Sequence, residues 1–341
     1  MTNFADVPLI DLATLARAGA DATHEMRVIE RACACEGFFR FRDNAGVPAG
    51  LVQQNFEMDR ILWESPPAQL AALFTDPSRD LSGRGIEMKG ARTLDVRVAE
   101  GKNDISMSFG WTREFTAHEA DELEIRCKDV LGIVPAWLDD FVRKPNRWPT
   151  WLSGFADAKL KLVERCRAPM GLFCEALESV VGCPRGEILG LIEAYNVRAR
   201  SNAYPPVIGS MQEGQQRAGK HTDYGILTFL FTGGPGLIIQ EKGSEPPEDP
   251  LEGLWHPVPH IPGTVICNIG DVLMLKYGLP STRHCVTAVA ENARELRQSI
   301  ALFLHADWWA SVQPGMCAGE ALLSRLTTAY RFAQSQVAQL S

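Results

Sequence analysis

The region after Gly182-Cys183-Pro184 limits most strongly the folds that this chain can adopt, because the pattern of the sequence changes there. Short apolar runs follow one another, separated by Gly and Pro. Runs of this length and spacing are typical of β-strands. We expect eight of them, at residues 195–204, 225–231, 236–240, 254–258, 263–268, 271–276, 284–290 and 297–305. Eight short strands suit two facing sheets, so the sequence predicts a mainly β fold with a double-stranded β-helix (jelly-roll) core and flanking helices.

Helical periodicity dominates the sequence before this core. Four elements are expected there: a strand at 7–12, a helix from an N-cap at Thr23 to Glu36, a strand at 38–41 and amphipathic helix at 48–75. The longest apolar pattern with helical spacing covers residues 155–181 and contains Pro169. Because proline removes a backbone hydrogen bond and clashes with the preceding turn, we expect a kink or a break there.

The C-terminal residues return to helical spacing, which Leu322 and Leu326 begin. This pattern predicts a helix that lies over the core. We therefore divide the chain into an N-terminal α/β region at 1–150, a long helix with the jelly-roll catalytic core at 151–310, and a C-terminal helix at 311–341.

Composition narrows the classes of function. The 341 residues include 34 basic and 42 acidic side chains, which gives a net charge of −8. No cluster of Lys and Arg interleaved with aromatic residues stands out, which argues against nucleic acid and favours a small-molecule partner. Neither a secretory leader nor a membrane-spanning run is visible, so we expect a cytoplasmic protein. The nine cysteines lack framework spacing and fit reduced thiols. No feature indicates an oligomeric state.

The candidate metal ligands lie in Gly219-Lys220-His221-Thr222-Asp223. A His and an Asp two positions apart project from the same side of an extended backbone, so both can reach one ion. His284, in a second extended run, can supply the third ligand. Two imidazoles and one carboxylate on one face of an octahedral ion, with open positions opposite, suit non-haem Fe(II).

The other histidines are weaker candidates for a metal site. His256 and His260 flank Pro257-Val258-Pro259, and we expect surface or structural roles for them. His305 shares a strand face with Arg297 but lies roughly 25 Å from it along the strand, so we leave it out of the site. His24 and His118 lie outside the predicted β core.

Arg297 and Ser299 form a second candidate constellation. A buried Arg is costly unless an anion pairs with it, and its planar fork matches a carboxylate in two parallel hydrogen bonds. Ser299, two residues further along, points to the same side and can donate a third hydrogen bond to the same carboxylate. Taken alone, this pattern is better explained by a salt bridge from Arg297 to a core Asp or Glu.

The predicted strand at 195–204 has one polar face. Alternation places Arg198, Arg200, Asn202 and Tyr204 on the same side. Such a face either meets solvent or lines a polar cavity, and a solvated face remains a rival interpretation for Arg198. Three further residues are candidates for contact with a substrate, namely Phe303 as an apolar wall, Ser108 in a predicted strand at 106–109, and Arg84.

Five segments carry a resemblance to a known family. They are Gly37-Phe38-Phe39, Asn146-Arg147-Trp148-Pro149, Asn202-Ala203-Tyr204-Pro205, His221-Thr222-Asp223 and Asn268-Ile269-Gly270-Asp271. The chain resembles the isopenicillin N synthase-like family of Fe(II)/2-oxoglutarate oxygenases. His284 lies 61 positions after Asp223, and Arg297 lies 13 positions after His284, separations similar to those of the family.

The resemblance implies roles for these residues. It makes His221, Asp223 and His284 the iron ligands, and it places Arg297 and Ser299 on the far carboxylate of 2-oxoglutarate. Asn202 and Tyr204 would approach the same cosubstrate. It also favours the cavity interpretation of the polar strand, in which Arg200 and Arg198 face an anionic or oxygen-rich substrate.

The implied reaction oxidises an unactivated C–H of a small metabolite, with O2 and 2-oxoglutarate as cosubstrates and succinate and CO2 as products. Hydroxylation is the default outcome, desaturation and ring formation or expansion are others, and secondary metabolism is a common setting. Three alternatives stay open. They are an iron oxidase of the same fold that uses no 2-oxoglutarate, a catalytically silent jelly-roll binding protein, and a zinc hydrolase with the same three ligands, which would leave Arg297 and Ser299 without a role.

Overall fold

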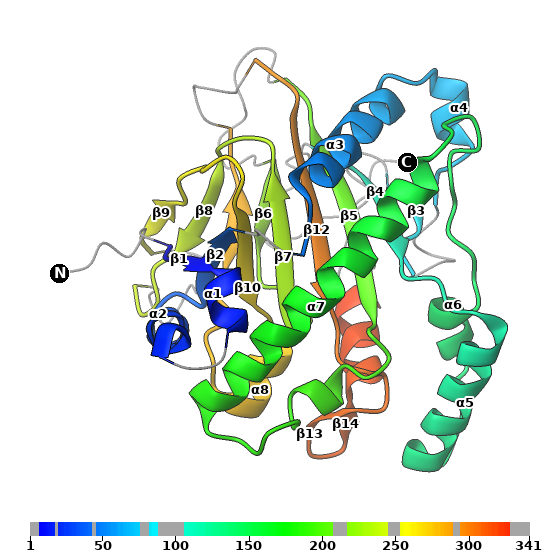
Figure 1. Ribbon diagram of the computed structural model, residues 1–341. Coiled ribbons are helices and arrows are strands. Elements are labelled where there is room, and N and C mark those ends of the chain that lie inside the picture. The colour runs from blue at the N-terminus through cyan, green and yellow to red at the C-terminus, as the bar shows by residue number, and fades with distance from the viewer. Residues whose placement is uncertain are drawn as a thin grey trace.

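The computed structural model describes residues 7–17, 20–42, 46–75, 82–87, 106–206, 217–244, 253–288 and 294–327. Two sheets form its β core (Figure 1). The larger sheet has the strand order β1 (Leu9–Asp11), β2 (Phe38–Arg42), β10 (Val265–Ile269), β7 (Leu227–Thr232), β12 (Arg297–Leu304), β5 (Val197–Tyr204), β4 (Met107–Thr112) and β3 (Gly85–Glu87). The smaller sheet has the order β6 (Ala218–His221), β11 (His284–Val286), β8 (Leu237–Gln240) and β9 (Trp255–Pro257).

Apolar side chains join the two sheets face to face. Phe38 and Ile266 of the larger sheet are buried in one cluster with Leu237 and Ile239 of the smaller one. A second small cluster joins Tyr204 of β5 to the strands β6 and β11. Burying this surface drives the two sheets together, and it confirms the predicted jelly-roll class.

The helices cover the outer face of the larger sheet. α7 (Phe155–Val181) runs across it, with α2 (Ala20–Ala34) and α3 (Ala49–Trp63) alongside (Figure 1). Phe173 of α7 packs against Phe39, Phe41 and Phe229 of the strands beneath, with ring centroids 4.9 to 5.9 Å apart. The remaining helical elements are α1 (Leu12–Ala16), α4 (Pro67–Ala71), α5 (Ala117–Leu131), α6 (Leu138–Val142), the 3-10 helix η1 (Leu189–Leu191) and α8 (Asp271–Tyr277).

Of the kink or break expected at Pro169, the break is wrong, because α7 is one continuous helix of 27 residues. Pro169 is buried within its packed face. Tertiary packing of the apolar face stabilises the helix enough to offset the hydrogen bond that proline removes.

Three other local expectations need correction. Residues 271–276 form the helix α8 and not a strand, because periodicity cannot separate the two in an apolar run this short. Thr23 lies inside α2 and does not cap it. The helical stretch at 48–75 divides into α3 and α4 just before Pro67, where proline fits the first turn of a new helix.

The chain also contains elements that the sequence did not predict. β6 has too few apolar residues to show alternation, and only its pairing with β11 defines it. A short hairpin of β13 (Ser311–Gln313) and β14 (Met316–Cys317) leads into a helical segment at residues 318–327. The predicted continuation of this helix, and the end of the predicted strand 284–290, lie outside the described residues. Within the described part of the chain, no helix is long and apolar enough to cross a membrane.

Candidate active site

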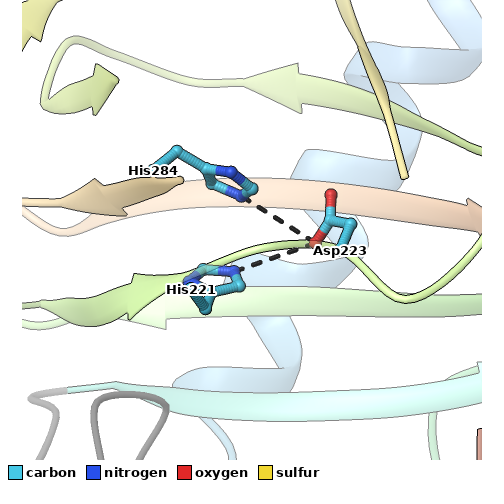
Figure 2. A group of neighbouring side chains, drawn as sticks. All are labelled: His221, Asp223 and His284. Carbon is cyan, nitrogen blue, oxygen red and sulfur yellow. Dashed lines mark ion pairs between the residues drawn. The ribbon is translucent and has the colours of Figure 1, made fainter. Parts of the chain in front are cut away.

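The two candidate imidazole ligands face each other across a strand pair. His221 ends β6 and His284 begins β11, and the two are direct partners in the antiparallel register. Their ring centroids lie 4.3 Å apart. Asp223 follows two residues after His221, and its Oδ1 lies 3.8 Å from Nε2 of each histidine (Figure 2). The ligand atoms of all three residues lie within 4.8 Å of one another, a spacing that fits a single metal ion.

Backbone carbonyls orient both rings. His221 Nδ1 lies 2.7 Å from the Gly219 oxygen, and His284 Nδ1 lies 3.1 Å from the Thr282 oxygen. A carbonyl can only accept, so each Nδ1 carries a proton, and Nε2, which faces Asp223, is the nitrogen left to bind a metal. Hydrogen bonds of this kind fix the tautomer and the ring angle that a metal ligand needs.

The carboxylate of Asp223 is also held by hydrogen bonds, which come from two side chains. Its Oδ2 accepts hydrogen bonds from Thr228 Oγ1 at 2.6 Å and from Asn268 Nδ2 at 2.7 Å. Burial alone would raise the pKa of this carboxyl, but the two histidines and these two hydrogen bonds lower it below its ordinary value. Asp223 therefore stays ionised, with Oδ1 directed toward the histidines. Two neutral imidazoles and one carboxylate are the donor set that non-haem Fe(II) takes.

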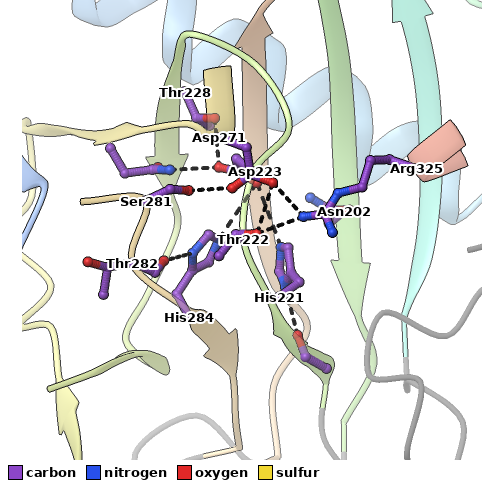
Figure 3. A network of polar contacts seen from close by, with 12 residues as sticks. Asn202, His221, Thr222, Asp223, Thr228, Asp271, Ser281, Thr282, His284 and Arg325 are labelled. Atoms are coloured by element: carbon purple, nitrogen blue, oxygen red, sulfur yellow. Dashed lines mark hydrogen bonds and ion pairs between the residues drawn. The ribbon is translucent and has the colours of Figure 1, made fainter. Parts of the chain in front are cut away.

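The turn at Asn268-Ile269-Gly270-Asp271 anchors this loop. Besides the Asn268 contact, the Asp271 backbone N–H donates to the Asp223 backbone oxygen at 2.7 Å. The Asp271 carboxylate accepts from Thr222 Oγ1 at 3.2 Å and from Ser281 Oγ at 2.7 Å (Figure 3). A Cβ at Gly270 would lie 2.2 Å from the Gly225 oxygen, so this close approach needs glycine. The sequence shows the motif, but its contacts appear only in the fold.

Arg297 and Ser299 lie on β12 of the larger sheet. The register pairs Arg297 with Tyr204 and Ser299 with Asn202 of β5. Asn202 Nδ2 donates to Ser299 Oγ at 3.4 Å, and the Tyr204 hydroxyl lies 3.5 Å from the same oxygen. The four predicted residues therefore form one polar group between two neighbouring strands.

The guanidinium of Arg297 is buried, with 2% of the residue exposed. Its Nε donates to the Pro235 oxygen at 2.8 Å, and its Cζ lies 4.9 Å from the centre of the Tyr204 ring. Nη1 and Nη2 have no hydrogen-bond partner in the part of the chain that the structure describes. Two parallel buried donors are what a carboxylate satisfies, so this group fits the far end of 2-oxoglutarate. Among the described residues no Asp or Glu makes the alternative salt bridge.

A cavity opens next to the metal centre and has an empty volume of about 590 Å³, part of it open to solvent. This size suits a small molecule. Its lining consists of Ser82, Gly83, Trp111, Arg198, Ala199, Arg200, His221, Thr222, Asp223, Tyr224, Phe303, His305, Leu322 and Leu326. Arg198, Arg200 and Phe303 therefore lie where the sequence placed them, close to the candidate ligands.

Ser108, one of the candidate substrate contacts, lies behind the cavity wall. It is not part of the lining that the described residues form, and its hydroxyl instead accepts from Arg200 Nη1 at 2.9 Å. Arg200 also forms a two-pronged ion pair with the buried Glu87, with Nη2 and Oε1 2.9 Å apart. Glu87 offsets the charge of Arg200, so Arg200 presents a hydrogen-bonded pair and not an isolated cation.

The placement of Arg84 at a substrate site needs correction. Its guanidinium donates to Thr112 Oγ1 at 3.2 Å and to the backbone oxygens of Asp140 and Phe141 in α6. The guanidinium donors of Arg84 are therefore used to hold α6 in place. Arg84 is not part of the cavity lining that the described residues form. Arg198 does reach the cavity, and its Nη2 donates to the Ser82 oxygen.

The sequence missed nine residues of the cavity wall, among them Trp111, Tyr224, His305, Leu322 and Leu326. His305 was excluded by its distance from Arg297, yet the cavity lies at the opposite end of β12, beside the metal centre. Burial, with the nearby charge of Arg198, lowers the pKa of His305 to about 3, although Asp223 opposes the shift. The ring is therefore neutral at ordinary pH. The even spacing of His305 from Arg297 and Phe303 along the strand was the sequence signal that its side chain faces inward.

Comparisons with known proteins agree with this geometry. Residues 194–306 match the family model of the 2OG-Fe(II) oxygenase superfamily. A homoarginine-6-hydroxylase of Arabidopsis thaliana is 27% identical over 84% of this chain and 71% of its own. The 2-oxoglutarate-dependent dioxygenase ucsF of Acremonium is 25% identical over 95% of this chain and 99% of its own length. A similar solved structure is that of a full-length Neurospora crassa protein in complex with alpha-KG, which is 2-oxoglutarate. It has a TM-score of 0.75 at 21% identity, and the match covers 94% of this chain and 96% of that chain.

The jelly roll and the His-Asp-His centre define a non-haem iron oxygenase. The matched region holds all three candidate ligands together with Arg297 and Ser299. Residues 194–306 match the 2OG-Fe(II) oxygenase superfamily, which confirms the resemblance seen in the sequence. Its cofactor is Fe(II), and its cosubstrates are 2-oxoglutarate and O2.

Proposed function

We propose that this enzyme oxidises an unactivated C–H bond of a small-molecule metabolite and releases succinate and CO2, with hydroxylation as the default outcome. The observation that carries the proposal is the pair of buried Nη donors of Arg297 that have no partner within the described part of the chain. The Tyr204 ring beneath this guanidinium is buried in one cluster with β6 and β11, the strands of the two candidate histidines. A zinc hydrolase with the same three ligands would have no use for that donor pair.

In this proposal His221 Nε2, Asp223 Oδ1 and His284 Nε2 hold the iron. The bound iron, with O2 and 2-oxoglutarate, supplies the oxidising power for C–H cleavage. The chain fixes the donors beforehand, because Gly219, Thr282 and the partners of Asp223 orient each ligand. Little reorganisation is then needed when the metal binds.

Arg297 and Ser299 would bind the far carboxylate of 2-oxoglutarate, with Asn202 and Tyr204 completing the polar group. The fork of Arg297 would hold that carboxylate through two parallel hydrogen bonds and so orient the cosubstrate. The aromatic face of Tyr204 covers the guanidinium and helps to exclude water.

The cavity supports a small polar substrate. Its lining combines the polar residues Arg198, Arg200 and His305 with the apolar residues Trp111, Phe303, Leu322 and Leu326. We expect an anionic or oxygen-rich group of the substrate to meet the polar part. Relatives are named for homoarginine hydroxylation, and one similar structure contains thymine. Desaturation and ring formation or expansion depend on where the substrate carbon sits.

In this proposal each of the three regions of the chain has its own role in the site. Residues 151–310 would supply the ligands, residues 1–150 would close the site through β3 and β4, and residues 311–341 would contribute the wall formed by Leu322 and Leu326.

The test is succinate formation. The protein is reconstituted anaerobically with Fe(II), and 2-oxoglutarate is supplied in air with and without a metabolite library that includes L-homoarginine and thymine. We expect iron-dependent succinate that rises with at least one compound. Arg297→Gln should raise KM for 2-oxoglutarate on the order of 100-fold, because a buried charged partner is lost. Gln298→Leu, the neighbouring position on β12, serves as the matched control.

The alternatives give different results. Oxygen consumption without succinate would favour the oxidase of the same fold. A purified protein that binds Fe(II) and 2-oxoglutarate but never turns over would favour the binding protein. An equal response of the Arg297 and Gln298 variants would remove the assigned role of Arg297.

A further inference from the structure

The helical segment at residues 318–327 supplies part of the substrate cavity. Leu322 and Leu326 line the cavity and are only 6% and 5% exposed. Both belong to an apolar cluster that includes Trp308 and Tyr224, and this cluster extends to α5 and α6. An apolar part of the cavity wall is therefore built by the last described part of the chain, about 100 positions after His221 in the sequence.

Arg325, on the same segment, contacts the loop that carries the metal ligands. Its Nη2 donates to Thr222 Oγ1 at 2.9 Å and also pairs with Oδ2 of Asp271 (Figure 3). Its Cζ lies 4.6 Å from the centre of the Tyr224 ring. A planar guanidinium can make a charged hydrogen bond, a hydroxyl contact and a stacking contact at once, whereas a point charge cannot.

These three partners surround the candidate ligands. Thr222 lies between His221 and Asp223, and Tyr224 follows Asp223 directly. Asp271 binds the Asp223 backbone oxygen through its own N–H, and its carboxylate also accepts from Ser281, three residues before His284. Arg325 therefore connects the segment 318–327 to a carboxylate that already joins the loops carrying all three ligands.

We propose that Arg325 is a positioning residue that holds the segment 318–327 against the metal-binding loop, and that Leu322 and Leu326 determine specificity by contacting an apolar part of the substrate. This inference rests on the proposed function, since it takes the cavity as the substrate site. It assigns the substrate an amphipathic character, with its polar group at Arg198 and His305 and its aliphatic or ring portion against the segment. An isolated surface ion pair would do little, but Arg325 joins three partners in a network.

The positioning claim can be tested without knowing the substrate. Protein with 13C-labelled leucine methyls is loaded with paramagnetic Co(II), with Zn(II) as the diamagnetic reference, and pseudocontact shifts are measured. Leu304, at the end of β12 on the rigid sheet, serves as the internal standard. We expect large shifts at Leu304, Leu322 and Leu326 in the natural protein. Arg325→Met should reduce the last two by at least about twofold, because the segment then samples positions farther from the metal.

Two further variants give the experiment its controls. Arg60→Met removes a similarly exposed arginine of α3 that pairs with Glu57 and with the C-cap residue Glu64, and it should change none of the shifts. Arg325→Lys keeps the charge but loses the fork, and it should recover the shifts in part. A merely destabilised fold would instead alter Leu304 together with the other two.

The specificity claim has its own test. Straight-chain carboxylates from butanoate to decanoate are titrated into the Co(II) protein saturated with 2-oxoglutarate, and the visible spectrum reports binding. Each added methylene should strengthen binding about threefold to fourfold until the wall is covered. The double variant Leu322→Ala/Leu326→Ala should lose this chain-length dependence.

The outcomes separate the two levels of the proposal. If Leu304 shows no pseudocontact shift, the metal does not bind at the three ligands and the proposed function fails. If Leu304 shifts but Arg325→Met leaves Leu322 and Leu326 unchanged, the positioning role of Arg325 fails alone. Binding that is independent of chain length, or equal in the double variant, would overturn the specificity role of the two leucines.

Discussion

His305 shows how burial sets the charge of a single cavity residue. It is 6% exposed at the end of β12, and burial together with Arg198 lowers its pKa to about 3, against the opposing effect of Asp223. The unfolded chain, with an ordinary pKa near 6.5, binds a proton below that pH, whereas the folded protein does not until about pH 3. Protonation therefore favours the unfolded state, and this group makes the fold less stable as the pH falls from about 6.5.

This linkage predicts a measurable pH dependence in the metal-free protein. From pH 7 to pH 5, His305 should cost the natural protein about 2 kcal/mol of unfolding free energy, and His305→Gln should remove that loss. Urea unfolding at the two pH values measures it. His118→Gln, at a position with 83% of the side chain exposed, serves as the control and should keep the natural difference. An unchanged pH dependence in His305→Gln would mean that the ring is protonated in the folded protein.

At the residue scale, the sequence predicted the positions whose chemistry depends on local spacing. His221 and Asp223 are two positions apart, and strand alternation correctly grouped Asn202 with Tyr204. Arg84 shows the limit, since an arginine with no periodic neighbours gives no indication of its partners. Its donors are used by α6, which only the tertiary fold brings close. Ser108 lies on β4, within the predicted strand, but its hydroxyl contacts Arg200 and it is not among the described residues that line the cavity.

Three elements meet at a buried ion pair beneath the cavity. Lys159 of α7 lies 2.6 Å from Asp59 of α3, and Ser201 of β5 contacts both at 3.0 and 2.7 Å. Burial raises the pKa of Asp59, and Lys159 opposes that shift. The Lys159 ammonium also lies 4.9 Å from the ring of Trp111, which lines the cavity. The pair thus joins two helices to the strand that carries the polar cavity face.

Removing one partner of this pair should be far more damaging than removing both. Lys159→Met leaves a buried carboxylate without its counter-charge and should lower the unfolding free energy by about 3–5 kcal/mol. The double variant Asp59→Leu/Lys159→Met should recover most of that loss, because no charge is then buried. Denaturant unfolding measures both. Arg60→Met, next to Asp59 but on the surface of α3, should have almost no effect; a similar loss in it would indicate a general fault in α3.

At the element scale, strong hydrophobic periodicity was sufficient to predict a helix or strand, and weak periodicity was not. α7 was predicted with its observed bounds because 27 residues give many turns of apolar spacing. The short apolar run at 271–276 fits a strand and a helix equally, and packing decides in favour of α8. β6 carries a metal ligand but almost no hydrophobic signal, since its strand pairing depends on β11. The spacing of Leu322 and Leu326 predicted a helix over the core, but the position of these two residues in the cavity wall depends on tertiary placement, which no local pattern encodes.

The candidate metal centre connects the two sheets of the whole molecule. His221 and His284 belong to the smaller sheet, while the hydrogen bonds of Asp223 lead to Thr228 and Asn268 on β7 and β10 of the larger one. A metal bound by all three residues therefore joins both sheets at once. Since the unfolded chain does not bring these ligands together, binding must stabilise the folded state as a whole.

The last prediction follows from that connection. Co(II) at about 100 times its Kd should raise the unfolding free energy by about 2.7 kcal/mol. Near-UV and far-UV circular dichroism should report the same shift, since one global transition is stabilised. His284→Gln should abolish the effect, whereas His256→Gln, at an ion pair with Glu241 on the sheet edge, should retain it. In the metal-loaded protein, 2-oxoglutarate should stabilise further, and Arg297→Gln should lose only this second increment. Equal stabilisation of the His284 and His256 variants would place the metal elsewhere, and a shift seen by only one spectral probe would mean that the metal holds a local loop without connecting the sheets.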